Sequence, residues 1–278
     1  MSEAADVHIN DVGVTFPDGP DGRPLEAIRK IDEHIEAGSF VSIVGPSGCG
    51  KSTLLSLVAG MQMPTRGEIV IGDRRVTAPD RSVGFVFQEE STLPWKTVEE
   101  NVSFGLRLAG VDRSEQRRIA KEMLQLVGLA GFESAYPSEL SGGMRQRVAI
   151  ARTLALDPTV LLMDEPFGAL DQQTRLLIGA EVRRIWRDTN KTVMFVTHDI
   201  QEAILLSEEV WVMSFRPAEV VDVIQIDLPP DRDSSVVGTE RFNALFGRIW
   251  GTVQGEAMHA FHVLEEGAGE GDRHHSRT

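Results

Sequence analysis

The sequence has little cysteine and no long apolar run, and each shortage excludes a class of protein. Among 278 residues there is one cysteine, Cys49, so no disulfide forms within the chain, and we expect a reducing, cytoplasmic setting. No apolar run approaches the roughly 20 residues that a membrane-spanning helix needs. The first residues also lack the charged and apolar regions of a secretory signal peptide. We therefore expect a soluble chain that reaches a membrane only through a partner.

Basic charge is scarce as well. The 28 lysines and arginines are outnumbered by 42 aspartates and glutamates, which gives a formal net charge of −14 and a sequence pI near 5.0. A nucleic-acid-binding protein usually carries a basic stripe, and binding to anionic lipid needs clustered Lys and Arg. The charge argues against both functions. Apolar residues make up 41% of the chain, enough for the core of one large domain or two small ones.

What the chain does contain is a glycine-rich turn between two apolar segments. Residues 40–44 are typical of a buried strand, and residues 54–59 are typical of a helix packed on a sheet. The turn between them matches the phosphate-binding P-loop in its required strand–turn–helix context, although an ordinary glycine-rich turn is the alternative. Its backbone N–H groups and the helix N-terminus would face a phosphate chain. We predict that a nucleoside triphosphate is bound by Gly45, Pro46, Ser47, Gly48, Cys49, Gly50, Lys51, Ser52 and Thr53.

Strand-like and helix-like segments alternate along the chain, which predicts an α/β fold with a mainly parallel sheet. We expect an N-terminal antiparallel β region, which starts with the alternating residues 7–16. From about residue 89 to 157 the apolar period changes from two to 3.6, which predicts an α-helical insert. Capping patterns predict helix starts at Thr97 and Asp112, and Asp171 is expected to cap a later helix. The helix behind Asp112 is predicted to have an apolar face formed by Ile119, Met123, Leu126 and Val127. The predicted division is a nucleotide-binding core (1–88 and 158–230), the insert (89–157) and a short C-terminal extension (231–278).

Within the extension, residues 242–250 predict a short amphipathic helix, and the end from Glu265 onward is expected to be disordered. His274 and His275 form a pair in this end. Without a third ligand in an ordered setting, we interpret them as a solvated tail and not as a metal site.

Two adjacent carboxylates follow the apolar run at residues 160–163. At the carboxyl end of a central parallel strand they would face the same crevice as the P-loop. Asp164 suits Mg²⁺, directly or through water, and Glu165 is placed to orient or deprotonate an attacking water. A strand that ends in polar residues on reaching solvent is the alternative, which the P-loop in the same chain disfavours.

A second glycine pair precedes another predicted helix. Ser141, Gly142 and Gly143 are either an ordinary N-cap with a hinge or a second seat for an anion, and the residues alone do not separate these interpretations. If each chain binds one ATP, two chains paired head to tail would place every γ-phosphate between the P-loop of one chain and the 141–143 helix start of the other.

Together these motifs resemble the nucleotide-binding subunit of an ATP-binding cassette (ABC) transporter. The family's motifs appear in order: the P-loop, Gln88, Leu-Ser-Gly-Gly-Met-Arg-Gln at 140–146, Met-Asp-Glu-Pro at 163–166, Gly-Ala-Leu-Asp at 168–171 and Thr-His-Asp at 197–199. The resemblance covers about residues 6–230. It implies the P-loop NTPase core of the ABC ATPase fold, an ATPase activity coupled to transport, and ATP and Mg²⁺ as cofactors.

The resemblance also implies roles for single residues around the nucleotide. Phe16, where tyrosine is commoner, would stack on adenine, although an aromatic at the end of a core strand is the alternative. Lys51 would reach the β- and γ-phosphates, and Ser52 and Asp164 would hold Mg²⁺. Gln88 would contact Mg²⁺ and the attacking water and signal to the helical insert.

Other residues would act on the γ-phosphate or across a dimer. His198 ends the strand after the Asp164 strand, and it would contact the γ-phosphate from the same crevice; a satisfied turn residue is the alternative. By resemblance, Ser141, Gly142 and Gly143 would bind the γ-phosphate of the ATP on the opposite chain, and Asp171 would cross the interface between the two copies.

Leu-Pro-Trp at 93–95 is similar to importers of nitrate, sulfonates and taurine, which predicts uptake of a small anion. By the same resemblance, residues 91–105 would contact transmembrane permease subunits at the cytoplasmic face of the cell membrane, and a substrate-binding protein would take part indirectly. Trp95 is otherwise a buried anchor at the start of a helix. The alternatives are an exporter or lipid-extraction subunit, or a non-transport ABC ATPase acting on nucleic acid or the ribosome, which the short insert and the negative charge disfavour.

Overall fold

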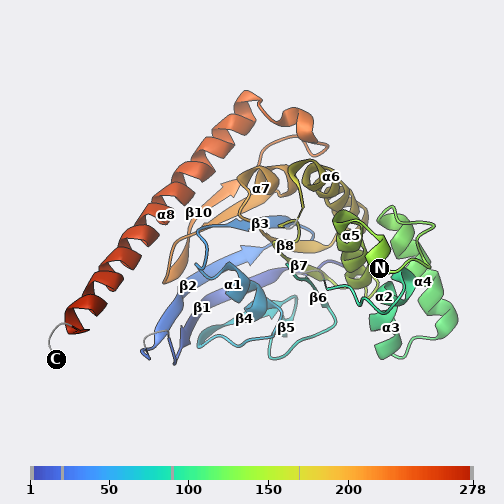
Figure 1. Cartoon of the computed structure of the whole chain (residues 1–278), viewed down its shortest axis with the longest axis horizontal. Coiled ribbons are helices and arrows are strands. Elements are labelled where there is room, and N and C mark those ends of the chain that lie inside the picture. Colours follow the sequence, from blue (N-terminus) through green and yellow to red (C-terminus); the bar gives the residue numbers. More distant parts are fainter. Residues whose placement is uncertain (1–2, 20–21, 89–90, 169, 276–278) are drawn as a thin grey trace.

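A computed structural model describes residues 3–19, 22–88, 91–168 and 170–275, with side chains up to Phe261 (Figure 1). Within these residues the strands form one ten-stranded sheet in the order β5-β4-β1-β2-β10-β9-β3-β8-β7-β6. The strands are β1 (Val7–Phe16), β2 (Leu25–Ile35), β3 (Phe40–Val44), β4 (Arg66–Ile71), β5 (Arg74–Arg75), β6 (Val83–Val86), β7 (Val160–Asp164), β8 (Thr192–Val196), β9 (Glu209–Met213) and β10 (Ala218–Gln225).

The centre of the sheet is parallel. β3 pairs with β8 and β9, and β7 pairs with β6 and β8, all in parallel register. The strands β3 and β8 are buried along their whole length, as expected for apolar strands covered on both faces. Because all five strands run the same way, the segments that follow them leave from one edge of the sheet. This edge carries the candidate site.

The N-terminal part of the sheet is antiparallel, as predicted. β1 lies between β2 and β4 and pairs antiparallel with both. β10 joins the two parts, since it pairs parallel with β2 and antiparallel with β9. The mixed sheet and its helices therefore confirm the predicted α/β class.

The region predicted to be a helical insert contains α2 (Val98–Val102), α3 (Phe104–Leu108), α4 (Arg113–Leu126) and α5 (Gly142–Leu154), which gather on one side of the molecule (Figure 1). A capping box at Thr97 and Glu100 starts α2, and Asp112 caps α4, as their sequences predict. The predicted apolar face of α4 is displaced slightly. Of the predicted residues, Val127 is fully buried, and Ile119, Met123 and Leu126 are half-buried at the margin of the face. The other fully buried residues of the face are Ala120 and Leu124.

Three more helices cover the core: α1 (Lys51–Val58), α6 (Gln172–Thr189) and α7 (Ile200–Leu206). Asp171 caps α6, because its carboxylate accepts the N–H groups of Gln173 and Thr174. Two short 3₁₀ helices span Pro137–Glu139 and Ser234–Val236. Among the helices in the described part of the chain, none is both long and apolar enough to cross a membrane.

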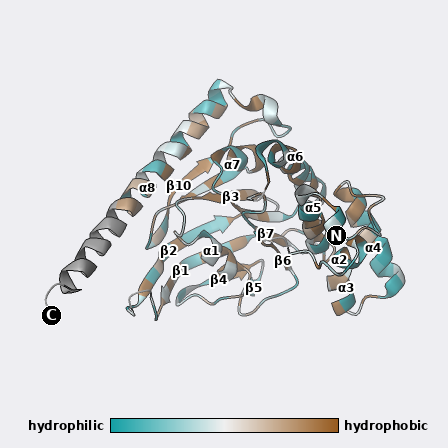
Figure 2. Cartoon of the chain, viewed as in Figure 1, coloured by the Kyte–Doolittle hydropathy of each residue, from teal (hydrophilic) through white to brown (hydrophobic). Residues whose placement is uncertain are grey.

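The last helix, α8 (Glu240–His275), is longer than the sequence predicts. Phe242, Leu245 and Ile249 are buried in a cluster with residues of α7 and β9, which accounts for the predicted amphipathic segment. Both hydrophilic and hydrophobic residues line its described length (Figure 2). The sequence predicts disorder from Glu265, whereas the helix continues to His275. Extending an existing helix costs far less free energy than nucleating one, so the packed start supports the extension.

Candidate functional site

The P-loop connects β3 to α1 at the carboxyl edge of the sheet. Gly50, with φ 116°, is the N-cap of α1 and has the left-handed conformation that a side chain rarely adopts. A Cβ on Gly45 would lie 2.7 Å from the carbonyl oxygen of Met213, so the turn packs against β9 only as glycine. The first N–H groups of α1 have no partner within the helix and are available to an anion.

Two P-loop side chains point to different partners. Lys51 is 6% exposed, and its Nζ donates hydrogen bonds to the carbonyl oxygens of Gly45 and Pro46, both at 2.9 Å. The Ser52 hydroxyl donates to Asp164 Oδ1 at 3.0 Å. The order of the strands in the sheet therefore brings the P-loop within hydrogen-bond distance of the carboxylate at the end of β7.

The oxygens of Ser52 and Asp164 suit a divalent cation. Hydroxyl and carboxylate oxygens are the ligands that Mg²⁺ prefers. Burial raises the pKa of the Asp164 carboxyl above its ordinary value; the Ser52 hydrogen bond and the Lys51 charge lower it, and the Glu165 carboxylate raises it further. A cation at this point would offset both the burial and the repulsion between the two carboxylates, so the donor set fits the expected Mg²⁺.

Glu165 brings together three predicted catalytic residues. Its Oε2 lies 3.0 Å from His198 Nδ1 and 3.4 Å from Gln88 Nε2. Its backbone has φ 41°, a conformation that costs a residue other than glycine about 1–3 kcal/mol and that clusters at functional sites. Its N–H donates to the Val196 carbonyl, which holds the strained residue against β8. Gln88, Glu165 and His198 follow β6, β7 and β8, so the carboxyl edge of the sheet places them together.

A cavity of about 290 Å³, here called the nucleotide cavity, opens beside the P-loop. Phe16 lines it together with Gly48, Lys51, Ser52 and Glu165. The aromatic ring predicted to meet a base and the turn predicted to meet phosphates thus face one space.

Arg216 also lines the nucleotide cavity, although no sequence motif marks it. It follows β9, the fifth parallel strand. Its position at the carboxyl edge of that strand is the one feature that indicates a place in the site. Its Nη2 lies 3.1 Å from the position of a Cβ on Gly48. Its buried Nε has no hydrogen-bond partner among the described residues. A guanidinium at this place adds positive charge beside the P-loop.

The second glycine motif lies apart from the nucleotide cavity. Ser141 caps α5 by accepting the N–H of Met144 at 3.3 Å, as an ordinary N-cap does. Gly143 has a packing role as well, because a Cβ there would lie 3.0 Å from Thr174 Cγ2 on α6. None of Ser141, Gly142 and Gly143 lines the nucleotide cavity. One copy of the chain therefore carries two separate helix starts.

Hydrogen bonds and ion pairs connect the Gly-Ala-Leu-Asp motif (168–171) to the segment after β8. Ala169 of this motif lies outside the described residues. Arg175 on α6 donates to the Leu170 carbonyl at 3.1 Å, and it pairs with Asp199 and Glu202, both at 3.2 Å. These contacts of Arg175, which no sequence motif indicates, connect the turn before Asp171 to the residues beside His198.

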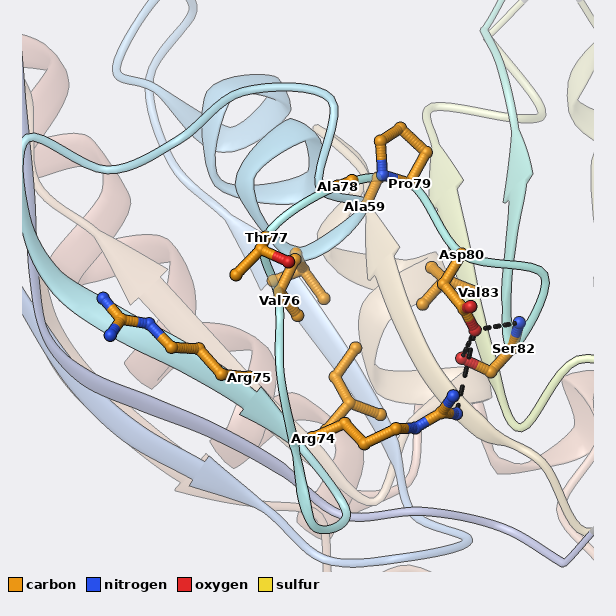
Figure 3. A pocket seen from close by; sticks show the side chains of 12 residues that line it. Ala59, Arg74, Arg75, Val76, Thr77, Ala78, Pro79, Asp80, Ser82 and Val83 are labelled. Atoms are coloured by element: carbon orange, nitrogen blue, oxygen red, sulfur yellow. Dashed lines mark hydrogen bonds and ion pairs between the residues drawn. The ribbon is translucent and has the colours of Figure 1, made fainter.

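A second cavity, of about 190 Å³, lies between the end of α1 and the segment that follows β5 (Figure 3). Its basic side chains are engaged in ion pairs: Arg74 lies 3.7 Å from Asp80, and Arg75 lies 3.2 Å from Glu68. Asp80 also accepts hydrogen bonds from Ser82. With these charges paired, we assign no ligand to this cavity.

Comparison with known proteins agrees with the geometry. The ABC transporter family model matches residues 28–168. The nitrate import ATP-binding protein NrtD of Synechocystis sp. is 49% identical over 208 residues, which cover 75% of this chain and 78% of that protein. The aliphatic sulfonates import ATP-binding protein SsuB of Bacillus cereus is 47% identical over 213 residues, covering 77% and 84%. An uncharacterized ABC transporter ATP-binding protein of Methanocaldococcus jannaschii is 47% identical over 216 residues, covering 78% and 81%.

Solved structures show the same fold. A dimeric ATP-binding cassette in a post-hydrolysis state, bound to ADP and Pi, has a TM-score of 0.69 and 34% sequence identity, and the match covers 80% of this chain and 100% of that one. A second dimeric structure of a bacterial ABC transporter cassette matches equally well. The chain therefore belongs to the ABC transporter family, as an ATP-binding subunit that hydrolyses ATP to drive transport and resembles the nitrate and sulfonate import group.

Proposed function

We propose that this subunit powers import of a small anion of the nitrate, sulfonate or taurine type, by ATP-driven closure of a head-to-tail dimer. The observation that carries the proposal is the separation of the two helix starts: the P-loop lines the nucleotide cavity, whereas Ser141 and its two glycines do not. A second copy, turned head to tail, brings its own Ser141 helix start to the nucleotide. The importer names of the relatives support the direction of transport.

In this proposal each side chain at the carboxyl edge has one task. The P-loop amides and Lys51 bind the phosphates, and Phe16 stacks on the base. Ser52 and Asp164 would hold Mg²⁺, with Gln88 nearby, and the cation would neutralise charge on the phosphates. Glu165 orients the attacking water and accepts its proton, and His198 contacts the γ-phosphate. Phosphoryl transfer of this kind depends on positioning and charge neutralisation.

The second copy completes the site. Ser141, Gly142 and Gly143 of one copy bind the γ-phosphate held by the other, and Asp171 contacts the other copy across the interface. Hydrolysis removes the γ-phosphate that both copies bind, so the dimer opens and the cycle restarts.

A surface on the insert is proposed to contact permease subunits at the cytoplasmic face of the membrane. Trp95 is 71% exposed and Leu108, at the end of α3, is 69% exposed. The alternative, that Trp95 is a buried anchor, is therefore wrong, because the side chain is largely exposed. Large exposed apolar side chains mark interaction surfaces. The predicted docking stretch, residues 91–105, contains one of them and ends three residues before the other.

The dimer is tested with two variants and one readout. Glu165→Gln keeps the shape of the side chain but removes the base, so we expect MgATP to be bound and trapped and the protein to elute as a dimer in size-exclusion chromatography. Adding Ser141→Arg fills the second helix start, and the double variant is expected to elute as a monomer. Unchanged ATP hydrolysis by Glu165→Gln would contradict the proposed mechanism. Elution of the double variant as a dimer would also contradict it.

The transported anion is tested in proteoliposomes that contain this subunit with the permease and substrate-binding protein of the proposed importer. We expect ATP-dependent uptake of nitrate, taurine or an alkanesulfonate, and none with Glu165→Gln. Outward movement of substrate would instead support an exporter.

A further inference from the structure

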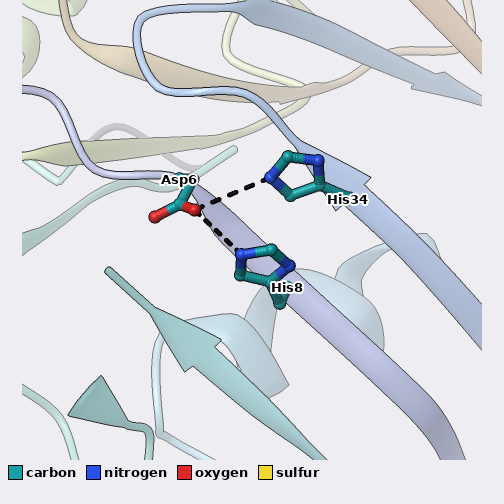
Figure 4. Close-up of side chains that lie close together, drawn as sticks. All are labelled: Asp6, His8 and His34. Atoms are coloured by element: carbon teal, nitrogen blue, oxygen red, sulfur yellow. Dashed lines mark hydrogen bonds and ion pairs between the residues drawn. The ribbon is translucent and has the colours of Figure 1, made fainter. Parts of the chain in front are cut away.

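Three side chains that commonly bind metals, Asp6, His8 and His34, lie together on the N-terminal part of the sheet (Figure 4). None of them lines the nucleotide cavity. His8 on β1 is directly opposite His34 on β2 in the antiparallel register, so both rings project from the same face. Asp6 immediately precedes β1. Its Oδ2 lies 2.8 Å from Nε2 of His8 and 3.7 Å from Nε2 of His34. Two imidazole nitrogens thus converge on one carboxylate oxygen.

The spacing matches a metal coordination sphere. With bonds of about 2.0–2.2 Å, the ligand atoms of a tetrahedral zinc ion lie roughly 3.3 Å from one another. The two distances to Asp6 fall on either side of that value, and the ligand atoms of all three residues lie within 4.8 Å of one another. The imidazole rings are stacked, with centroids 4.2 Å apart and planes 13° apart. Because the lone pair of each nitrogen lies in the plane of its ring, one ring must turn out of the stack before both nitrogens can bind one ion.

The backbone around the cluster is held on both sides. The Asp6 carbonyl accepts the N–H of Gly72 at 3.0 Å, and the Ala5 carbonyl accepts the Thr192 hydroxyl at 2.6 Å. The ladder between β1 and β2 fixes His8 against His34. Because strands and paired backbone hold the three Cα atoms, a metal would need side-chain rotations, including one ring turning out of the stack, but no backbone movement.

The surroundings favour a cation and leave one coordination position open. A cavity of about 350 Å³ next to His34 is also lined by Glu36, Glu208 and Glu209, whose carboxylates make the local potential negative. The side chains of Asp6, His8 and His34 are 37%, 40% and 46% exposed, so water can take a fourth position. Imidazole and carboxylate together favour zinc, copper or nickel, whereas Mg²⁺ prefers oxygen ligands alone.

We propose that Asp6, His8 and His34 form a site for a divalent transition metal, with Zn²⁺ as its representative. The site is separate from the Mg²⁺ ligands Ser52 and Asp164 and does not depend on the transport proposal. It joins β1 to β2 at the end of the hairpin away from Phe16, which lies roughly 25 Å along β1 at about 3.3 Å per residue. A bound metal would fasten the two strands together at this end.

The test uses the full chain with its four C-terminal histidines (His259, His262, His274 and His275) replaced by alanine, so that they do not compete for metal. Zn²⁺ is titrated by calorimetry without nucleotide and with excess Mg²⁺, and Co²⁺ is followed by visible absorption. We expect one equivalent of Zn²⁺ to bind, and a Co²⁺ spectrum typical of four-coordinate nitrogen and oxygen ligands. Metal should also raise the melting temperature.

Single substitutions in that background identify the ligands. Asp6→Asn and His34→Ala should each weaken Zn²⁺ binding at least about tenfold, because even outer partners of metal ligands contribute about 10–100-fold. His34→Cys, which supplies another zinc ligand, should retain binding and shows that a loss is not caused by misfolding. His198→Ala removes a histidine elsewhere and should leave this affinity unchanged. Zn²⁺ binding that Mg²⁺ abolishes, or that is equally tight in His34→Ala, would overturn the proposal and leave a hydrogen-bonded pair of stacked rings.

Discussion

Replacing Glu202 by glutamine should change how the free energy of unfolding varies with pH. Glu202 lies in the first turn of α7 and is 8% exposed. Its Oε2 accepts a hydrogen bond from the Thr197 hydroxyl at 2.6 Å, and its Oε1 lies 3.2 Å from Arg175 Nε. Burial raises the pKa of Glu202 from 4.5 to about 7; the Thr197 hydrogen bond lowers it in part, and the charge of Asp199 raises it.

The sign follows from which state holds the proton. Between pH 4.5 and about 7 the folded chain keeps a proton on Glu202 that the unfolded chain has released. Stability is therefore lost as the pH rises through this window. At about 1.4 kcal/mol for each pKa unit the full effect is about 3 kcal/mol, of which about 2 kcal/mol falls between pH 5.5 and 8.5. Glutamine has no proton to release, so its stability lacks this decline.

Urea unfolding at four pH values from 5.5 to 8.5 measures the effect while staying above the pI near 5.0. We expect the stability of Glu202→Gln relative to the parent to rise by about 2 kcal/mol across this range. Glu122→Gln is the matched control, because its side chain is 53% exposed on α4, and its difference from the parent should stay within about 0.5 kcal/mol. Parallel profiles for Glu202→Gln and the parent would refute the argument that burial holds a proton on Glu202.

Three further predictions concern the nucleotide site and the helix start at Ser141. Lys51→Ala should weaken MgATP binding about 10–100-fold in equilibrium titration, since a hydrogen bond to a charged group contributes about 1.5–3 kcal/mol. Arg216→Ala should weaken it at least about tenfold for the same reason, with partial recovery in Arg216→Lys. Gly143→Ala should lower the free energy of unfolding by about 1–3 kcal/mol, because its Cβ would meet Thr174. Gly247→Ala, which has no heavy atom within 4 Å, is the control and should raise stability by about 0.5–1 kcal/mol.

Each of these has a contrary outcome. Full MgATP affinity in Arg216→Ala would mean that the guanidinium does not face the phosphates, and full affinity in Lys51→Ala would remove the phosphate contact assigned to the P-loop lysine. A Gly143→Ala chain as stable as the parent would mean that α5 moves away from α6 at no cost.

Motifs whose physical rules are local were predicted from the sequence. The P-loop needs a strand, glycines and a helix within a short segment, and the caps at Thr97, Asp112 and Asp171 depend on residues only a few positions away. Local sequence rules predict less well whether a side chain is buried or exposed. Trp95 was assigned a buried alternative, yet the ring is exposed, because what covers a side chain depends on elements far along the chain.

Residues brought together across the fold were the ones that sequence patterns did not reveal. Arg216 carries no motif, and it joins the nucleotide cavity because β9 is parallel to β3. His8 and His34 are separated by a hairpin, and strand register places one opposite the other.

The amino-acid sequence alone determined the kind of chemistry, which is the binding and hydrolysis of a nucleoside triphosphate. The glycines, the lysine and the carboxylates at the ends of apolar strands indicate this chemistry through residue type and short spacing. Tertiary structure decided which of these groups meet: Ser52 with Asp164, and Glu165 with His198 and Gln88. It also decided that the Ser141 helix start lies outside the cavity it is proposed to serve. Those contacts depend on strand order and on the common direction of five parallel strands, which no short stretch of sequence contains.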